Sequence, residues 1–206
     1  FGLPDPLYWA VFGQNVDIAL LLVRAKADME FLLGGTVSAL MVASELGDLR
    51  MIEMLLAEGA KINAKNWIGE TALLYAVKAN KMIAVEKLLS AGADTFATSA
   101  FHKDSPLTLA VFKGYSDIVQ RLLKAGADVN VENCKGNTAL LIATEKGDIG
   151  TMRLLLKAGA NKDAQNKQGM SALLLAEEAD HLEAAKLLVE FGADVDIRDN
   201  DGLSAL

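Results

Sequence analysis

Leucines recur along the chain at a nearly constant interval, each preceded by a serine, threonine or aspartate and then a small residue or proline. Five of the six spacings are 33 residues and one is 34, in the series Leu7, Leu40, Leu73, Leu107, Leu140, Leu173 and Leu206. An alanine follows three residues after the leucine in all six complete periods. Because a fixed period of this length is typical of repeat architectures, the pattern predicts a row of similar supersecondary units.

The stretch from Gly136 to Asn166 shows how one unit is expected to fold. Thr138 stands where a helix N-cap is needed, and Leu140, three and four residues before Ala143 and Thr144, shares a face with them. Asp148 then opens a second helix, which Gly159 ends in the left-handed conformation. The second helix carries the apolar stripe Met152, Leu155 and Leu156. The pattern therefore predicts a helix–turn–helix unit.

The unit resembles the ankyrin repeat, whose signature is a glycine turn, Thr-Pro-Leu-His, a short helix, Gly-His, and a second helix ending in Leu-Leu-x-x-Gly-Ala-Asp-x-Asn. Matching stretches lie at Gly69–Leu73, Asp104–Leu107, Leu122–Asn130 and Leu188–Asp196. The tetrapeptide histidine is missing from every unit, and Lys103 replaces the turn glycine where the spacing lengthens. The resemblance implies an all-α ankyrin-repeat solenoid of stacked helix–turn–helix units with β-hairpin-like finger loops.

We expect residues 1–206 to form a single ankyrin-repeat domain. The repeats are predicted at about residues 1–32, 33–65, 66–99, 100–132, 133–165 and 166–198, with a partial seventh at 199–206. Neighbouring units should stack, because neither helix of a unit can bury its apolar stripe alone. The first unit, with Phe1 and Leu3, and the last, which stops at Leu206, both lack the polar outer face of a capping repeat. We therefore expect a piece of a longer array or of a larger protein.

Composition narrows the classes of function. Apolar residues make up 52% of the 206, which the alanines and leucines of a stacked core explain, and the longest apolar runs, such as 18–23 and 71–77, are well short of the roughly 18 residues of a membrane-spanning helix. Membrane insertion is not expected. The net charge of −7 disfavours nucleic acid as a partner. The single cysteine excludes a disulfide framework, so we expect a reducing, cytoplasmic or nuclear location.

The sequence contains no recognised catalytic or cofactor-binding motif, so we expect no enzyme activity, no cofactor and no metal site. His181 falls where the family's Gly-His places a structural histidine. His102 lies beside Asp104 and Ser105, but neighbours in one turn cannot readily form a catalytic triad. Residues 196–202 look like the start of a calcium loop whose frame fails, since Ile197 would hold the first ligand position. Cys134 is interpreted as an idle fingertip thiol.

The resemblance implies that partner-binding residues lie at the finger tips and on the concave face of the first helices. Exposed aromatic side chains are typical of binding hot spots. The predicted binding residues are Trp67, Ile68, Lys78, Phe101, His102, Phe112 and Tyr115. In the alternative interpretation, Phe96 and Phe101 fold inward to fill the lengthened loop and Trp67 lies flat against its own finger.

The leading hypothesis is a non-enzymatic protein–protein interaction module, monomeric on its own, that presents a concave surface and finger loops to a protein or peptide. One alternative is the regulatory or targeting segment of a larger enzyme, channel or ligase adaptor. Another is a free-standing secreted effector that acts in the cytosol of a host cell. An enzyme in its own right, using His102, is disfavoured because no catalytic constellation accompanies that histidine.

Overall fold

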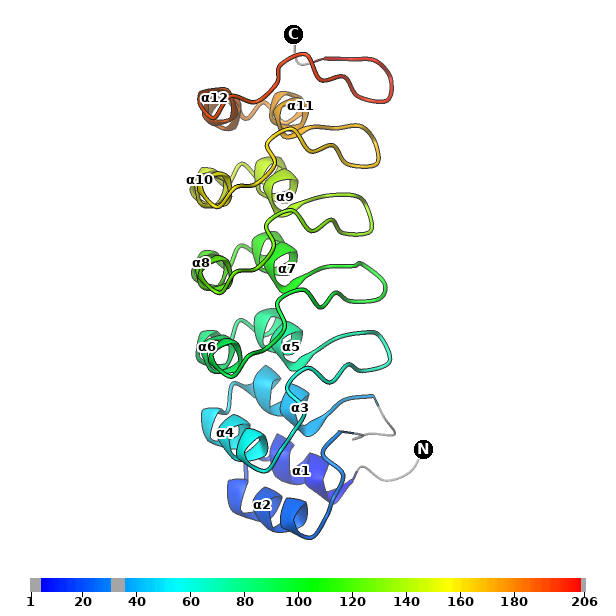
Figure 1. Ribbon diagram of the computed structural model, residues 1–206, viewed down its shortest axis with the longest axis vertical. Coiled ribbons are helices and arrows are strands. Elements are labelled where there is room, and N and C mark those ends of the chain that lie inside the picture. The colour runs from blue at the N-terminus through cyan, green and yellow to red at the C-terminus, as the bar shows by residue number, and fades with distance from the viewer. Residues whose placement is uncertain (1–4, 31–35, 205–206) are drawn as a thin grey trace. The chain divides into compact units, whose positions relative to one another are not determined.

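The computed structural model describes residues 5–30 and 36–204, in which twelve short helices follow one another in pairs (Figure 1). Two compact units are formed, by residues 1–100 and 101–206. The expected features at Phe1, Leu3 and Leu206 lie outside the described residues. The assignment of the whole chain to a single domain stays a prediction.

The first unit contains three helix pairs in two layers. The inner helices, which are the first of each pair and lie next to the fingers, are α1 (Pro6–Phe12), α3 (Ala39–Leu46) and α5 (Ala72–Lys78), and the outer helices are α2 (Val16–Arg24), α4 (Leu49–Ala57) and α6 (Met82–Ser90) (Figure 1). α3 packs against α1 and α5, and α4 packs against α2 and α6. Each helix thus buries its apolar face against its partner and the next pair.

The second unit repeats this arrangement. Its inner helices are α7 (Pro106–Lys113), α9 (Ala139–Glu145) and α11 (Ala172–Glu178), and its outer helices are α8 (Ser116–Lys124), α10 (Ile149–Lys157) and α12 (Leu182–Glu190). α9 packs against α7 and α11, and α10 packs against α8 and α12. The predicted all-α class of stacked helix–turn–helix repeats is confirmed.

Short polar side chains cap the inner helices and the outer helices α2, α4 and α10, as predicted at Thr138 and Asp148. Thr138 accepts a hydrogen bond from the backbone N–H of Leu141 at 3.4 Å, and Asp148 accepts one from Thr151 at 3.0 Å. The side chains of Asp5, Ser38, Thr71, Ser105 and Ser171 cap the other inner helices. Gly159 has a φ of 89°, so the expected left-handed end of the second helix is confirmed. Capping at every repeat compensates for helices of only two turns, which are marginal alone.

The core consists of small and branched aliphatic side chains. The periodic leucine near the start of each of the six inner helices is at most 6% exposed, and the alanines three residues later are equally buried. The alanine methyl groups let neighbouring helices approach closely, which is why this core needs few aromatic rings. In the part of the chain that the structure describes, every helix is too short to cross a membrane.

Candidate partner-binding surfaces

The predicted binding residues fall into two groups, three in the first unit and four in the second. In the first unit, the finger tip that carries Trp67 and Ile68 is held by Asn66. The Asn66 side-chain oxygen accepts backbone hydrogen bonds from Ile68 at 3.1 Å and Glu70 at 2.8 Å. Trp67 is 71% exposed, whereas Ile68 is half-buried and its carbonyl accepts a hydrogen bond from Ala100. The indole therefore projects from a tightly bonded turn, which argues against a ring lying flat on its own finger.

Lys78, the third predicted residue of this group, is engaged within the protein. Its ammonium donates to a carboxylate oxygen of Glu70, a side chain that is only 5% exposed, and lies 5.7 Å from the centre of the Tyr75 ring. Burial and the negative charge of Glu70 raise the pKa of Tyr75, although a hydrogen bond from Asn66 opposes the shift. This network ties the base of the finger to α5. A partner that uses Lys78 has to compete with Glu70.

Sequence reasoning missed an aromatic patch on α1. The rings of Tyr8 and Phe12 stack with centres 5.7 Å apart, and Trp9 stands edge-on to both. Trp9 is 56% exposed and Phe12 is 50% exposed. The signal was present, because Phe12 occupies the same position of its repeat as Lys78 and Phe112, five residues after the periodic leucine.

The second unit begins with the finger of longer spacing. Phe101 is 66% exposed and Phe96, in the preceding loop of the first unit, is 59% exposed, so neither ring fills the lengthened loop. His102 is exposed and its carbonyl accepts a hydrogen bond from the backbone of Cys134 at 2.8 Å. Lys103 takes a φ of 53° at the place where other fingers have glycine. This finger therefore presents an aromatic ring and an imidazole on a backbone that is anchored to the next finger.

Phe112 and Tyr115 lie at the end of α7 and at the start of α8. Phe112 is 58% exposed, and the ammonium of Lys146 lies 5.4 Å from its ring centre while donating to its carbonyl oxygen. Tyr115 is half-buried and precedes the first residue of α8. The Phe112 ring thus keeps one face available next to a positive charge, whereas Tyr115 offers only part of its surface.

A polar hollow of about 500 Å³ lies between the fingers and the inner helices of the second unit, and the sequence did not predict it. Its rim carries Lys135 and Lys167 from the fingers, and Glu145 and Glu178 come from α9 and α11. Both glutamates stand five residues after a periodic leucine, which is the signal that could have indicated it. The hollow has mixed charge and suits a polar segment of a partner.

His181 and Cys134, both considered for chemistry, are half-buried in the second unit. The ring Nδ1 of His181 lies 3.0 Å from the carbonyl oxygen of Thr144, so the expected structural role of this histidine is confirmed. Cys134 is half-buried with a free thiol. Within the described ranges, no three metal-ligating side chains come close enough together to hold an ion.

A family model described as ankyrin repeats in three copies matches residues 7–99, 40–133 and 107–199. Human "Ankyrin repeat and SOCS box protein 6" is 37% identical over 144 residues, which are 69% of this chain and 34% of that protein. "Putative palmitoyltransferase ZDHHC13" of Danio rerio is 31% identical over 141 residues, which are 67% of this chain and 22% of that protein. The chain thus spans about a third or less of these relatives.

Two solved structures resemble the fold. The ankyrin repeat domain of Bcl-3, described as a unique member of the IkappaB protein family, superposes with a TM-score of 0.89 at 26% identity, over 98% of this chain and 92% of that one. An ankyrin repeat domain from Acinetobacter baumannii AYE gives a TM-score of 0.76 at 34% identity, over 81% of this chain and 87% of that one.

Proposed function

This chain belongs to the ankyrin repeat family, whose repeats are protein-interaction modules, and we propose that it holds a protein or peptide through exposed aromatic side chains of its fingers and inner helices. One observation carries the proposal. Only 6% of the residues are aromatic, yet Trp67, Phe101 and Phe112 are each more than half exposed. Buried anchors of this type contribute about 2 kcal/mol or more to binding when a partner covers them.

The backbone under these anchors supports the same proposal. Trp67 sits in a turn closed by hydrogen bonds to Asn66, and Phe101 is flanked by backbone groups bonded to neighbouring fingers. Because the backbone is already ordered, a partner has to immobilise only side chains, each at about 0.5 to 1.5 kcal/mol. Preorganisation of this kind favours affinity without a rearrangement on binding.

The test compares what three purified proteins retain from a lysate of the source cells. The double variant Trp67→Ala/Phe112→Ala is expected to lose the partner while keeping the urea midpoint of the wild type, because both rings are exposed. Ile83→Ala is the matched control, since Ile83 is 61% exposed but lies on the outer helix α6. A partner retained equally by all three proteins contradicts the proposal, and so does a large loss of stability in the double variant, which would assign the rings to the core.

We further propose that the array is the recognition part of a longer protein and is itself non-enzymatic. The relatives support this proposal: "L-asparaginase" of Dirofilaria immitis shares 29% identity with this chain over only 24% of its length. An antibody against the repeats should detect a protein clearly longer than 206 residues in the source cells, and a protein of that length alone contradicts this part. We also propose that the protein is monomeric and has no affinity for nucleic acid, which its net charge of −7 supports. The single cysteine supports a cytoplasmic or nuclear location.

A further inference from the structure

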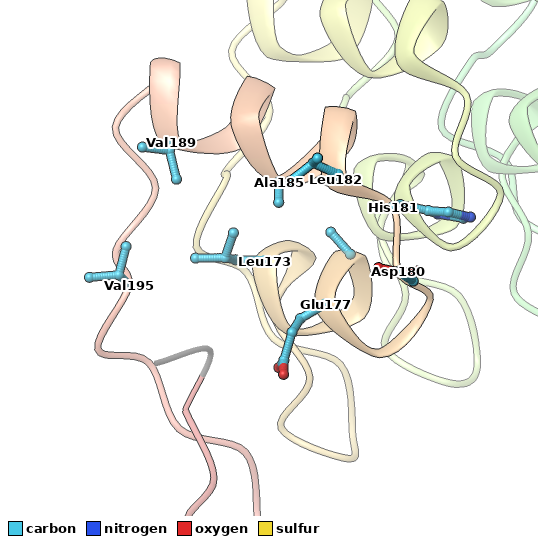
Figure 2. A pocket seen from close by; sticks show the side chains of 9 residues that line it. Leu173, Glu177, Asp180, His181, Leu182, Ala185, Val189 and Val195 are labelled. Atoms are coloured by element: carbon cyan, nitrogen blue, oxygen red, sulfur yellow. The ribbon is translucent and has the colours of Figure 1, made fainter.

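Two hollows of the second unit differ in what the neighbouring repeat does to them. An apolar hollow of about 270 Å³ lies against α11 and α12 (Figure 2). Val189, which lines it, is 54% exposed, but Leu156 at the same position of the preceding repeat is only 7% exposed, because α12 packs against its helix α10. The apolar hollow is therefore a face on which repeats stack.

The polar hollow of about 500 Å³ between the fingers and the inner helices is a different kind of surface. Glu145 lines it and stays exposed although α11 packs against its helix α9. Lys135 also lines it and stays exposed although the next finger donates a hydrogen bond to its carbonyl oxygen. Stacking of the repeats thus leaves the polar hollow open.

Charges of opposite sign line the two sides of the polar hollow. Lys135 and Lys167 belong to the fingers, Glu145 and Glu178 belong to α9 and α11, and all four residues are exposed. In the part of the chain that the structure describes, none of the four belongs to an ion pair. Water between the two sides therefore screens their attraction. An occupant with a charge on each side gains contacts that the chain does not make for itself.

The two lysines come from neighbouring fingers that contact each other. The backbone N–H of Lys167 donates to the carbonyl oxygen of Lys135 at 3.1 Å. A Cβ on Gly136 would lie 3.2 Å from the Cγ of Lys167, so the stem of this lysine lies against the neighbouring finger. Because neither ammonium group is paired with a carboxylate, this side of the hollow favours an acidic side chain. The two glutamates on the other side favour a basic one.

Between these charges, the polar hollow offers a hydrogen-bond donor and two apolar side chains. The Asn137 side-chain oxygen accepts a hydrogen bond from the Asn166 side chain at 3.0 Å, while the Nδ2 group of Asn137 donates none within the described residues. Met170 and Leu175 are half-buried beside it. A backbone carbonyl can accept from Asn137 only if no helix already uses it. An extended segment suits the polar hollow better than a helix for this reason.

We propose that the polar hollow holds an extended segment of the protein partner in which an acidic and a basic residue are adjacent. The acidic side chain lies against Lys135 and Lys167, and the basic one lies against Glu145 and Glu178. Successive side chains of an extended chain point to opposite sides, so two neighbouring residues reach both sides of the hollow. This inference rests on the proposed function in taking the partner to be a protein, and it uses none of the aromatic anchors.

The test is a selection of short linear peptides of random sequence, displayed on phage, against the whole 206-residue protein. Peptides selected on the wild type are expected to share an acidic residue next to a basic one. On Glu145→Lys/Glu178→Lys, the enriched peptides should keep the acidic residue and lose the basic one. On Lys135→Glu/Lys167→Glu, they should keep the basic residue and lose the acidic one. A one-sided loss in each variant assigns each charge of the peptide to its side of the hollow.

The best wild-type binder, made as a free peptide, is then titrated calorimetrically. Lys135→Glu/Lys167→Glu is expected to weaken its binding at least about tenfold. Lys124→Glu/Lys157→Glu is the matched control and should weaken it by less than about threefold, because these exposed lysines end the outer helices α8 and α10 and do not line the hollow. Circular dichroism melts close to that of the wild type are expected for both variants, since all four lysines are exposed.

Three results overturn the inference: no peptide is enriched, the enriched peptides show no charge preference, or Lys135→Glu/Lys167→Glu binds them as tightly as the wild type. Failure of the proposed function gives a different result. Trp67→Ala/Phe112→Ala leaves the polar hollow intact, so it should bind the selected peptide within about threefold of the wild type even where it loses the cellular partner. Loss of the peptide in that variant would place the peptide on the aromatic residues and would also overturn the inference.

Discussion

Replacing Lys78 by methionine is expected to lower the free energy of unfolding of the first unit by about 2 to 3 kcal/mol. The Lys78 ammonium pairs with Glu70, whose side chain is 5% exposed, while the Lys78 side chain itself is 43% exposed. Methionine keeps most of the aliphatic length but removes the charge. Glu70 then keeps a negative charge in a site nearly closed to water, next to the ring of Tyr75, whose ionisation it already disfavours.

The size of this loss in unfolding free energy follows from the unequal burial of Lys78 and Glu70. Removing one partner from a fully buried ion pair costs about 3 to 5 kcal/mol, whereas an exposed pair contributes about 0 to 1 kcal/mol. Water reaches the ammonium but hardly reaches the carboxylate, so the value lies between these limits. The ammonium also lies 5.7 Å from the ring centre of Tyr75, which adds about 0.5 kcal/mol at a half-exposed site.

The assay is urea unfolding followed by tryptophan fluorescence. Both tryptophans, Trp9 and Trp67, belong to the first unit, so fluorescence reports on that unit while circular dichroism follows all the helices. The double variant Glu70→Gln/Lys78→Met should recover most of the loss, because the buried charge is gone. Lys65→Met, on an exposed lysine of the same finger, is the control. A Lys78→Met protein within about 0.5 kcal/mol of the wild type would refute the reasoning.

Three further predictions concern the finger loops and the tyrosine. Lys103→Gly should stabilise the protein by about 1 kcal/mol, because Lys103 holds a φ of 53°, and a melting temperature at or below that of the wild type contradicts this. Tyr75 should ionise above its ordinary pKa of 10.0. Its contribution to stability is therefore complete below pH 10.0 and is lost as the pH rises through the raised pKa. An absorbance titration of tyrosinate should show that the pKa of Tyr75 is lower in Glu70→Gln than in the wild type. Gly169→Ala should destabilise by about 1 to 3 kcal/mol more than Gly159→Ala in urea unfolding, because only at Gly169 would the new Cβ lie 2.6 Å from the backbone of Asn200. Equal losses in the two alanine variants would contradict this steric explanation.

The features that the sequence predicted correctly are those decided within a few residues of the chain. Thr138 and Asp148 cap their helices with side chains that reach three residues ahead, and Gly159 takes a left-handed conformation that needs no tertiary contact. The leucine period then repeats these local decisions at each unit. Helix positions and stacking could therefore be predicted from spacing alone.

The candidate surfaces were less accessible to such reasoning. The pairing of Lys78 with Glu70 joins residues eight positions apart across the end of a finger, and only the path of that loop brings the two charges together. The exposure of Lys78 at a concave helix position could be predicted from the sequence. Its ion pair with Glu70 of the same chain could not.

The extra residue of the fourth repeat can be assigned from the backbone hydrogen bonds. In each of the next two fingers, one residue donates a backbone hydrogen bond to the preceding finger, and the residue directly after it accepts one from the following finger. Lys167 and Gln168 form such a pair. In the fourth finger the donor is Ala100 and the acceptor is His102, so Phe101 is the inserted residue. Both hydrogen bonds are kept, so the insertion leaves the backbone pairing of the fingers intact. What it adds is the Phe101 side chain, whose ring is 66% exposed. An insertion that keeps the hydrogen bonds between fingers and adds an aromatic ring to the surface changes what the finger can bind. Phe101 therefore belongs among the proposed anchors.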